Sequence, residues 1–238
     1  MNFNNYQQEV SSYRYGRTFE EVASSVMKSV YLKMTFALLV TAFVSLGVAV
    51  LAPQFALLLA TNSWVFWGLA IVEIGAVIYL SARLDKMSGT TASMLFYLYA
   101  LLNGVTLSLI FAAYSLPSIA QTFFITAGTF GAMSVYGYFT KSDLSKIGSI
   151  LYMALFGLII CIVVNLFMKS GTLDFIISGA GVLIFVGLTA WDTQKIKTMV
   201  QMNPNATDGR LATIGALTLY LDFINLFLYL LRFLGNRD

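Results

Sequence analysis

Five ionisable side chains lie where an apolar environment makes charge costly. Glu73 and Asp222 lie inside long apolar runs, and Asp192, Arg83 and Arg232 lie near the ends of such runs. A charge at the middle of a membrane-spanning helix is disfavoured by roughly 2.5–3.5 kcal/mol, so it pairs, faces the protein interior or lines water. These side chains are therefore the candidates for ion and proton chemistry.

Asp222 gives the strongest signal, because an aspartate is too short to extend far toward the membrane surface. A helix through Asp222 carries further small or polar residues on the same face, at offsets of −7, −4, +3 and +7: Gly215, Thr218, Asn225 and Tyr229. Thr218 and Asn225 are the candidate supporting groups. The stripe predicts a face directed at protein or water, with a structural hydrogen bond as the alternative.

Three of the five ionisable side chains also have simpler explanations. Asp192 precedes Lys195 by three residues, so an ordinary ion pair at the membrane surface accounts for it as well as a function does. Arg83 and Arg232 could extend to lipid headgroups, as arginines at span ends commonly do.

Spacing nevertheless links the groups, because the second and seventh apolar runs cross the membrane in opposite directions. Glu73 and Arg83 are ten residues apart, as are Asp222 and Arg232, and ten helical residues rise about 15 Å. If Arg83 meets Asp222 at one depth, Glu73 meets Arg232 at another, as an outer ion pair. With Asp192 included, the set of five side chains contains three acids and two bases. Two acids that share a proton avoid an unpaired buried charge and respond to pH without histidine.

The depths of the two aspartates conflict when they are counted from the charges at the inner ends of the spans. Asp192 lies three residues from Lys195, whereas Asp222 lies twelve residues from Arg210. The two coincide only if the seventh helix begins nearer residues 214–216, or if water penetrates from inside.

The composition identifies the elements that carry these residues. The chain has 238 residues, of which 58% are hydrophobic and 11% charged, against roughly 45–50% apolar and about 25% charged in soluble domains. This predicts an all-α integral membrane protein. Histidine is absent, which excludes a Ser-His-Asp triad, a histidine zinc site and an imidazole pH switch. The single Cys161 allows no internal disulfide, and a net charge of +3 does not suggest nucleic acid as a partner.

Apolar runs of about 20 residues, the length that crosses roughly 30 Å of hydrocarbon, predict a bundle of seven transmembrane helices. The expected spans are Tyr31–Ala52, Ser63–Ala82, Ala92–Tyr114, Ser118–Phe139, Gly148–Met168, Leu173–Lys195 and Leu211–Leu234. Small residues four apart in the fourth span, Ala127 with Gly131 and Gly128 with Ala132, predict close helix packing.

The sequence predicts two regions: a polar cytoplasmic tail at residues 1–29 and a single transmembrane domain at residues 30–235. The tail and the connections expected on its side carry eleven of the fourteen Lys and Arg residues. Because cytoplasmic loops are enriched in these residues, the N-terminus is predicted inside and the C-terminus outside.

Three stretches resemble the bacterial branch of the Bax inhibitor 1 family, also called the transmembrane Bax inhibitor motif family. They are Val186-Gly187-Leu188-Thr189-Ala190-Trp191-Asp192-Thr193-Gln194-Lys195, Leu217-Thr218-Leu219-Tyr220-Leu221-Asp222-Phe223-Ile224-Asn225-Leu226-Phe227 and Phe130-Gly131-Ala132-Met133-Ser134. The resemblance extends from about Lys28 to Gly235, and the match around Asp222 is its most specific part.

The resemblance implies a central helix surrounded by the others and a pH-sensitive calcium leak through a bacterial inner membrane. It assigns a proton-sensitive latch, and with it the calcium path, to Asp192 and Asp222. A basic residue at the inner end of the second helix holds one of them, and Arg83 is the candidate, although the family has an arginine cluster there. Glu73 and Arg232 match the family's outer acid and arginine.

These residues bear on three classes of function. A calcium channel in contact with membrane lipid, with no cofactor, is the first. The second is a regulator that binds a membrane-bound quality-control protease through a tail containing Tyr13-Arg14-Tyr15 and Glu20-Glu21. An intramembrane aspartyl protease is disfavoured, because Leu219-Tyr220-Leu221 stands where Gly-x-Gly precedes the second acid of such enzymes. We expect no enzymatic activity.

Overall fold

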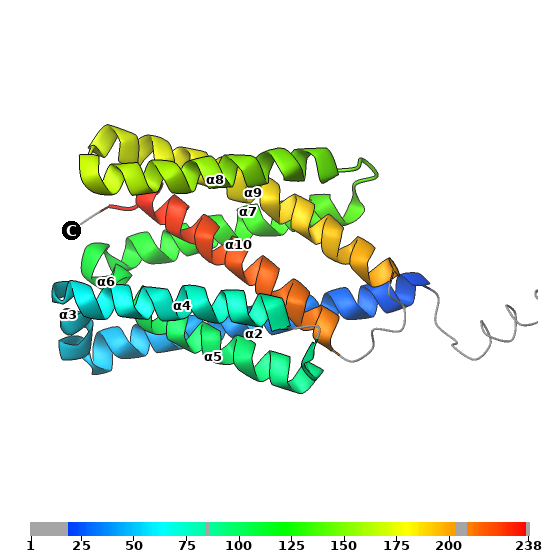
Figure 1. The fold of residues 1–238 in the computed structure, drawn as a ribbon, viewed down its shortest axis with the longest axis horizontal. Helices are drawn as coiled ribbons and strands as arrows, with labels where there is room; N and C mark the ends of the chain where they lie inside the picture. The colour runs from blue at the N-terminus through cyan, green and yellow to red at the C-terminus, as the bar shows by residue number, and fades with distance from the viewer. Residues whose placement is uncertain (1–18, 84–85, 203–208, 237–238) are drawn as a thin grey trace, which may run out of the picture.

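The computed structural model describes residues 19–83, 86–202 and 209–236, and these residues form a bundle of long helices (Figure 1). The helices are α2 (Phe19–Leu51), α3 (Pro53–Thr61), α4 (Ser63–Arg83), α5 (Gly89–Leu107), α6 (Ile110–Ala113), α7 (Leu116–Phe139), α8 (Ser145–Met168), α9 (Gly171–Met202) and α10 (Arg210–Leu234). The described part of the chain contains no strand. The predicted all-α membrane fold is therefore confirmed.

Among the described residues, six helical segments are long and apolar enough to cross a bilayer, against the seven predicted. Helix α7 is the segment outside that set, although it has 24 residues and packs against α9 and α10. It is less apolar than its neighbours because it includes Gln121, Thr122 and Thr126. Figure 1 shows α7 running along the bundle with the other long helices. The seventh crossing stays a prediction.

Helix α10 lies at the centre of the bundle and packs against α2, α5, α7 and α9 (Figure 1). Along most of its length its side chains are buried, and Ala216, Leu219, Tyr220 and Leu226 are fully enclosed. The outer helices instead expose large apolar side chains, among them Phe43 of α2, Ile78 of α4 and Phe156 of α8. Such a surface requires an apolar solvent, because water would make its exposure unfavourable.

Helix α2 begins at Phe19, inside the predicted polar tail of residues 1–29. Its buried side chains recur every three or four residues, at Ala23, Met27, Val30 and Met34, which is the period of one helix face. The apolar face therefore extends the helix beyond the hydrophobic run alone. Tyr13-Arg14-Tyr15, the proposed handle for a partner, lies outside the described residues.

Close packing by α7 occurs at a different glycine from the two predicted. A Cβ atom added to Gly128 or Gly131 would meet no atom within 4 Å, whereas one added to Gly137 would overlap the Ala190 carbonyl group of α9. The prediction of close packing at Ala127/Gly131 and Gly128/Ala132 is therefore wrong at the glycines. Small-residue spacing identifies faces that permit close approach, but the neighbouring helix decides where the approach occurs.

Candidate functional site

The centre of the candidate site is a pair of buried carboxyl groups, Asp192 of α9 and Asp222 of α10. The two residues are 2% and 5% exposed, and their carboxyl groups lie close enough to form a hydrogen bond with each other. A hydrogen bond between two carboxyl groups requires that one of them carries a proton, because a carboxylate can only accept. The pair therefore has the geometry of two acids that share one proton.

The length of α9 brings the two aspartates to one depth. Helix α9 continues past Lys195 to Met202, so Asp192 lies ten residues before its end. Asp222 lies twelve residues after the start of α10 at Arg210, and the two rises are about 15 and 18 Å at 1.5 Å per residue. The similar depth of the two aspartates therefore requires neither a later start of α10 nor the entry of water. Counting from Lys195 was misleading because the helix continues beyond the apolar run.

Aromatic residues and uncompensated polar atoms surround the pair. Tyr152 of α8 lies close enough to interact electrostatically with both aspartates, and its ring meets that of Trp191 edge-on at 5.3 Å. Asp222 Oδ2 and Thr193 Oγ1 are buried and make no hydrogen bond to any described residue. The sequence contains no signal for Tyr152, because the predicted span around it, Gly148–Met168, carries no charge.

Thr218 and Asn225 lie half-buried on the Asp222 side of α10, but they do not bond to the carboxyl group. Thr218 Oγ1 donates to the Ile214 carbonyl at 3.1 Å, and Asn225 Nδ2 donates to the Leu221 carbonyl at 2.8 Å. Both side chains therefore satisfy their own helix backbone. They make the face around Asp222 polar without fixing the position of its carboxyl group.

The structure does not bring Arg83 to the aspartate pair. Arg83 is the exposed last residue of α4, and α4 packs mainly against α5 and α3. Among the described residues no ion pair joins Arg83 to Asp192 or Asp222. The positive charge that acts on Asp192 is that of Lys195, one turn further along α9. Arg83 was placed by matching depths, but helix α4 is not a neighbour of α9.

Glu73 belongs to a separate hydrogen-bonded cluster on the opposite side of α10. It accepts from the Thr106 hydroxyl at 2.5 Å and is hydrogen-bonded to Asn103, both on α5. Asn103 Oδ1 accepts from the Tyr220 hydroxyl at 3.1 Å, and the Tyr220 and Thr41 hydroxyls lie 2.7 Å apart. Tyr220 and Asp222 are two residues apart and so point to opposite sides of the helix.

Arg232 forms its ion pair with Asp174 of α9. The predicted outer pair of Glu73 and Arg232 is therefore replaced by two separate interactions, because α9 and not α4 lies beside the end of α10. Asp174 was missed, although it had a signal: an acid in the first turn of a helix, at the same predicted membrane face as Arg232.

Lys33 of α2 was counted only as an inner charge, yet it joins three helices. Its ammonium group donates to Ser93 Oγ at 2.6 Å, to Thr213 Oγ1 at 2.7 Å and to the Gly209 carbonyl at 3.3 Å. Gly209 precedes α10 and has a φ of 74°, a conformation that favours glycine. Lys33 thus fixes the start of the central helix against α2 and α5.

The described acidic side chains do not form a cluster of metal ligands. Within residues 19–83, 86–202 and 209–236 there is no group of three or more His, Cys, Asp or Glu side chains placed to hold a metal ion. Calcium takes about six to eight oxygen ligands when it is held tightly, and the Asp192–Asp222 pair offers only two carboxyl groups.

Comparisons with known proteins identify a matching family and similar proteins from other bacteria. The family described as "Inhibitor of apoptosis-promoting Bax1" matches residues 23–238. The inner membrane protein YbhL of Escherichia coli K12 is 50% identical over 214 residues, which cover 89% of this chain and 91% of that protein. A protein of Rickettsia prowazekii is 45% identical over 222 residues, 93% of each chain.

The likeness to YbhL, together with the six apolar helices, identifies the chain as a multi-pass protein of the bacterial inner membrane. The family match covers all the long helices, including both aspartates of the buried pair. The resemblance seen in the sequence is thereby confirmed: the chain belongs to the Bax inhibitor 1 family.

Proposed function

We propose that the protein lets calcium pass slowly through the membrane and that the Asp192–Asp222 pair makes this passage depend on pH. The observation that carries the proposal is the close approach of two buried carboxyl groups on neighbouring helices. Membership of the Bax inhibitor 1 family supports the same assignment through the resemblance around both residues.

The pair couples proton binding to helix packing through electrostatic repulsion. When one proton is shared, the carboxyl groups attract each other and hold α9 against α10. When both are ionised, two unit charges about 4 Å apart repel by about 4 kcal/mol at an effective dielectric constant of about 20. Separation of the helices or binding of a cation relieves that repulsion. Calcium is a hard cation that prefers oxygen ligands, so it suits the ionised pair.

Calcium uptake into proteoliposomes tests the proposal. Uptake by the purified protein is measured with a trapped calcium-sensitive dye at several values between about pH 5 and pH 8, the range over which a perturbed carboxyl group changes charge. We expect wild-type uptake to change with pH, and Asp222→Asn to remove that dependence. The same is expected of Asp192→Asn.

Asp143→Asn is the matched control, because Asp143 is an exposed aspartate of the α7–α8 turn, outside the pair. It should keep the wild-type pH profile. If Asp222→Asn also keeps that profile, the pair does not regulate calcium passage. Protein-free liposomes give the background leak.

A further inference from the structure

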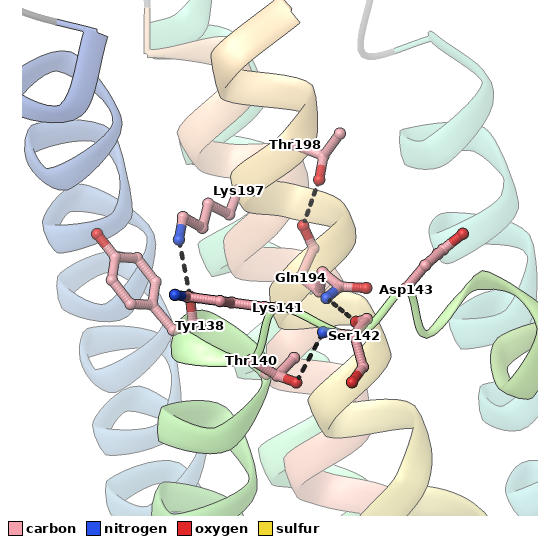
Figure 2. A pocket seen from close by; sticks show the side chains of 9 residues that line it. Tyr138, Thr140, Lys141, Ser142, Asp143, Gln194, Lys197 and Thr198 are labelled. Carbon is pink, nitrogen blue, oxygen red and sulfur yellow. Dashed lines mark hydrogen bonds between the residues drawn. The ribbon is translucent and has the colours of Figure 1, made fainter.

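A polar pocket of about 300 Å³ lies where α7 ends, α8 begins and α9 passes beside them (Figure 2). The charge distribution predicts this end of the bundle to be cytoplasmic. Its walls come from the α7–α8 turn and from Gln194, Lys197 and Thr198 of α9. The pocket therefore lies within two turns of Asp192 along α9, at the expected height of lipid headgroups.

Two lysines give the pocket its charge. The Lys197 ammonium donates to the Tyr138 carbonyl at 2.8 Å and lies 4.4 Å from the centre of the Tyr138 ring. An ammonium group has three protons to donate, so this contact leaves two of them for another acceptor. Lys141 is exposed on the turn, and in Figure 2 both lysine side chains extend toward Tyr138.

Gln194 holds the shape of the pocket. Its Nε2 donates to the Ser142 carbonyl at 2.8 Å, while its Oε1 accepts from the Leu144 amide at 2.9 Å. Thr140 Oγ1 accepts from the Ser142 amide at 3.3 Å, so its own hydroxyl proton remains available for donation. The turn is thus fixed to α9, and the donors are held in place before a ligand arrives.

Asp143 also lines the pocket and contributes one negative charge. Its Oδ1 accepts from the Ser145 amide at 2.9 Å. Hydrogen bonds from Ser145, together with the nearby charge of Lys146, hold the pKa of Asp143 below its ordinary value. The pocket lining therefore carries the two positive charges of Lys141 and Lys197 against the one negative charge of Asp143, a net charge of +1.

We propose that this pocket binds a phosphate group. Two ammonium groups and a hydroxyl donor suit the several oxygen acceptors of a phosphate, and basic pockets between helices at the cytoplasmic face are suited to anionic headgroups. The phosphate can belong to an anionic lipid or to a soluble molecule. Binding would hold the α7–α8 turn against α9 through the same side of the helix that Gln194 engages. The proposal is independent of calcium passage.

Binding to the purified full-length protein tests the proposal with two probes. Native mass spectrometry compares bound phosphatidylglycerol with bound phosphatidylcholine, and thermal unfolding compares sodium phosphate with sodium chloride at equal ionic strength. Lys141→Gln combined with Lys197→Gln should weaken phosphatidylglycerol or phosphate binding by about 30-fold, or about 1 kcal/mol per lysine. Lys141→Gln alone should weaken it by about five-fold without disturbing the Tyr138 contact.

Lys146→Gln is the matched control, because Lys146 lies beside the pocket in the first turn of α8 but does not line it. It should bind both probes as the wild type does. A phosphatidylglycerol preference lost only in the Lys141 and Lys197 variants supports a lipid headgroup; a phosphate-dependent stabilisation lost in the same variants supports a soluble phosphate. Equal binding by all variants, or an equal loss in Lys146→Gln, would overturn the proposal.

Discussion

At the scale of single residues, three acidic residues stabilise and regulate the contact between α9 and α10. Asp192 and Asp222 lie close together near the middle of the bundle, and Asp174 pairs with Arg232 nearer the end of α10. In the proposed function the first interaction contains a proton and responds to pH, whereas the second is an ordinary ion pair. We expect the Asp174–Arg232 pair to act as a fixed point about which the aspartate contact can change.

Arg232→Gln should destabilise the protein by about 1–2 kcal/mol, between the values for exposed and for buried ion pairs. The Asp174 and Arg232 side chains are 23% and 33% exposed, so solvent screens the pair only in part. Unfolding in detergent measures the loss. The charge-reversed double variant Asp174→Arg with Arg232→Asp should recover part of it. Lys169→Gln, at an exposed lysine near the start of α9, should change little; an equal loss there would mean that the pair has no special role.

Sequence reasoning was most successful where two residues lie on adjacent, sequential helices. The contact between Asp192 and Asp222 follows from their similar depths on α9 and α10, once the true end of α9 is known. The partners of Glu73 and Arg232 could not be deduced in the same way. Depth alone cannot show which helices are neighbours, and Glu73 is satisfied by the uncharged Thr106 and Asn103, which charge counting does not detect.

At the scale of helices, backbone contact between α7 and α9 fixes the position of the aspartate-bearing helix. A Cβ atom at Gly137 would overlap the Ala190 carbonyl oxygen, two residues before Asp192. Backbone atoms cannot move aside as a flexible side chain does. The α7–α9 spacing is therefore part of the support for the carboxyl pair.

Gly137→Ala should destabilise the protein by about 1–3 kcal/mol, the usual cost of overpacking, and should alter the pH profile of calcium uptake. Gly131→Ala on the same helix is the matched control, since it has open space and alanine favours helix by up to about 1 kcal/mol over glycine. Thermal unfolding in detergent distinguishes the two. Equal stability of both variants would contradict the packing argument.

Lys33 anchors the start of α10 to α2 and α5, so Lys33→Met should loosen the first turns of the central helix. Hydrogen exchange at the Thr213 and Ala216 amides should quicken, because removal of the ammonium group leaves the Gly209 carbonyl and the Thr213 hydroxyl without this donor. Lys28→Met, at an exposed lysine of the same helix, should leave exchange unchanged. Unchanged exchange in Lys33→Met would show that the helix start is held by other contacts.

At the scale of the whole molecule, the arrangement of α7 decides the topology. The start of α2 and the end of α10 lie at opposite ends of the bundle in Figure 1, as an odd number of crossings requires. Composition predicted the membrane class and most helix positions, because the apolar runs are long. Composition does not decide whether α7 crosses the membrane. The polar residues of α7 are accommodated by contacts with α9 and α10, which hydropathy does not record.

Seven crossings place the two termini on opposite sides of the membrane, whereas six would place them on the same side. A reporter enzyme that works only in the periplasm should therefore be active when it is fused after Asp238. A fluorescent protein that works only in the cytoplasm should fluoresce when it is fused before Met1. Alkaline phosphatase and green fluorescent protein fusions provide the two readouts. A fluorescent C-terminal fusion would contradict the predicted orientation and the seventh crossing.

The most direct test of the account is the separation of the Asp192 and Asp222 carboxyl groups in experimental structures of the membrane-embedded protein at about pH 5 and pH 8, on either side of the expected titration. The account predicts hydrogen-bond contact at the lower pH and a longer separation at the higher pH, where both groups are ionised. The same separation at both pH values would contradict it, because the pair would then have no means of coupling proton binding to the packing of α9 against α10.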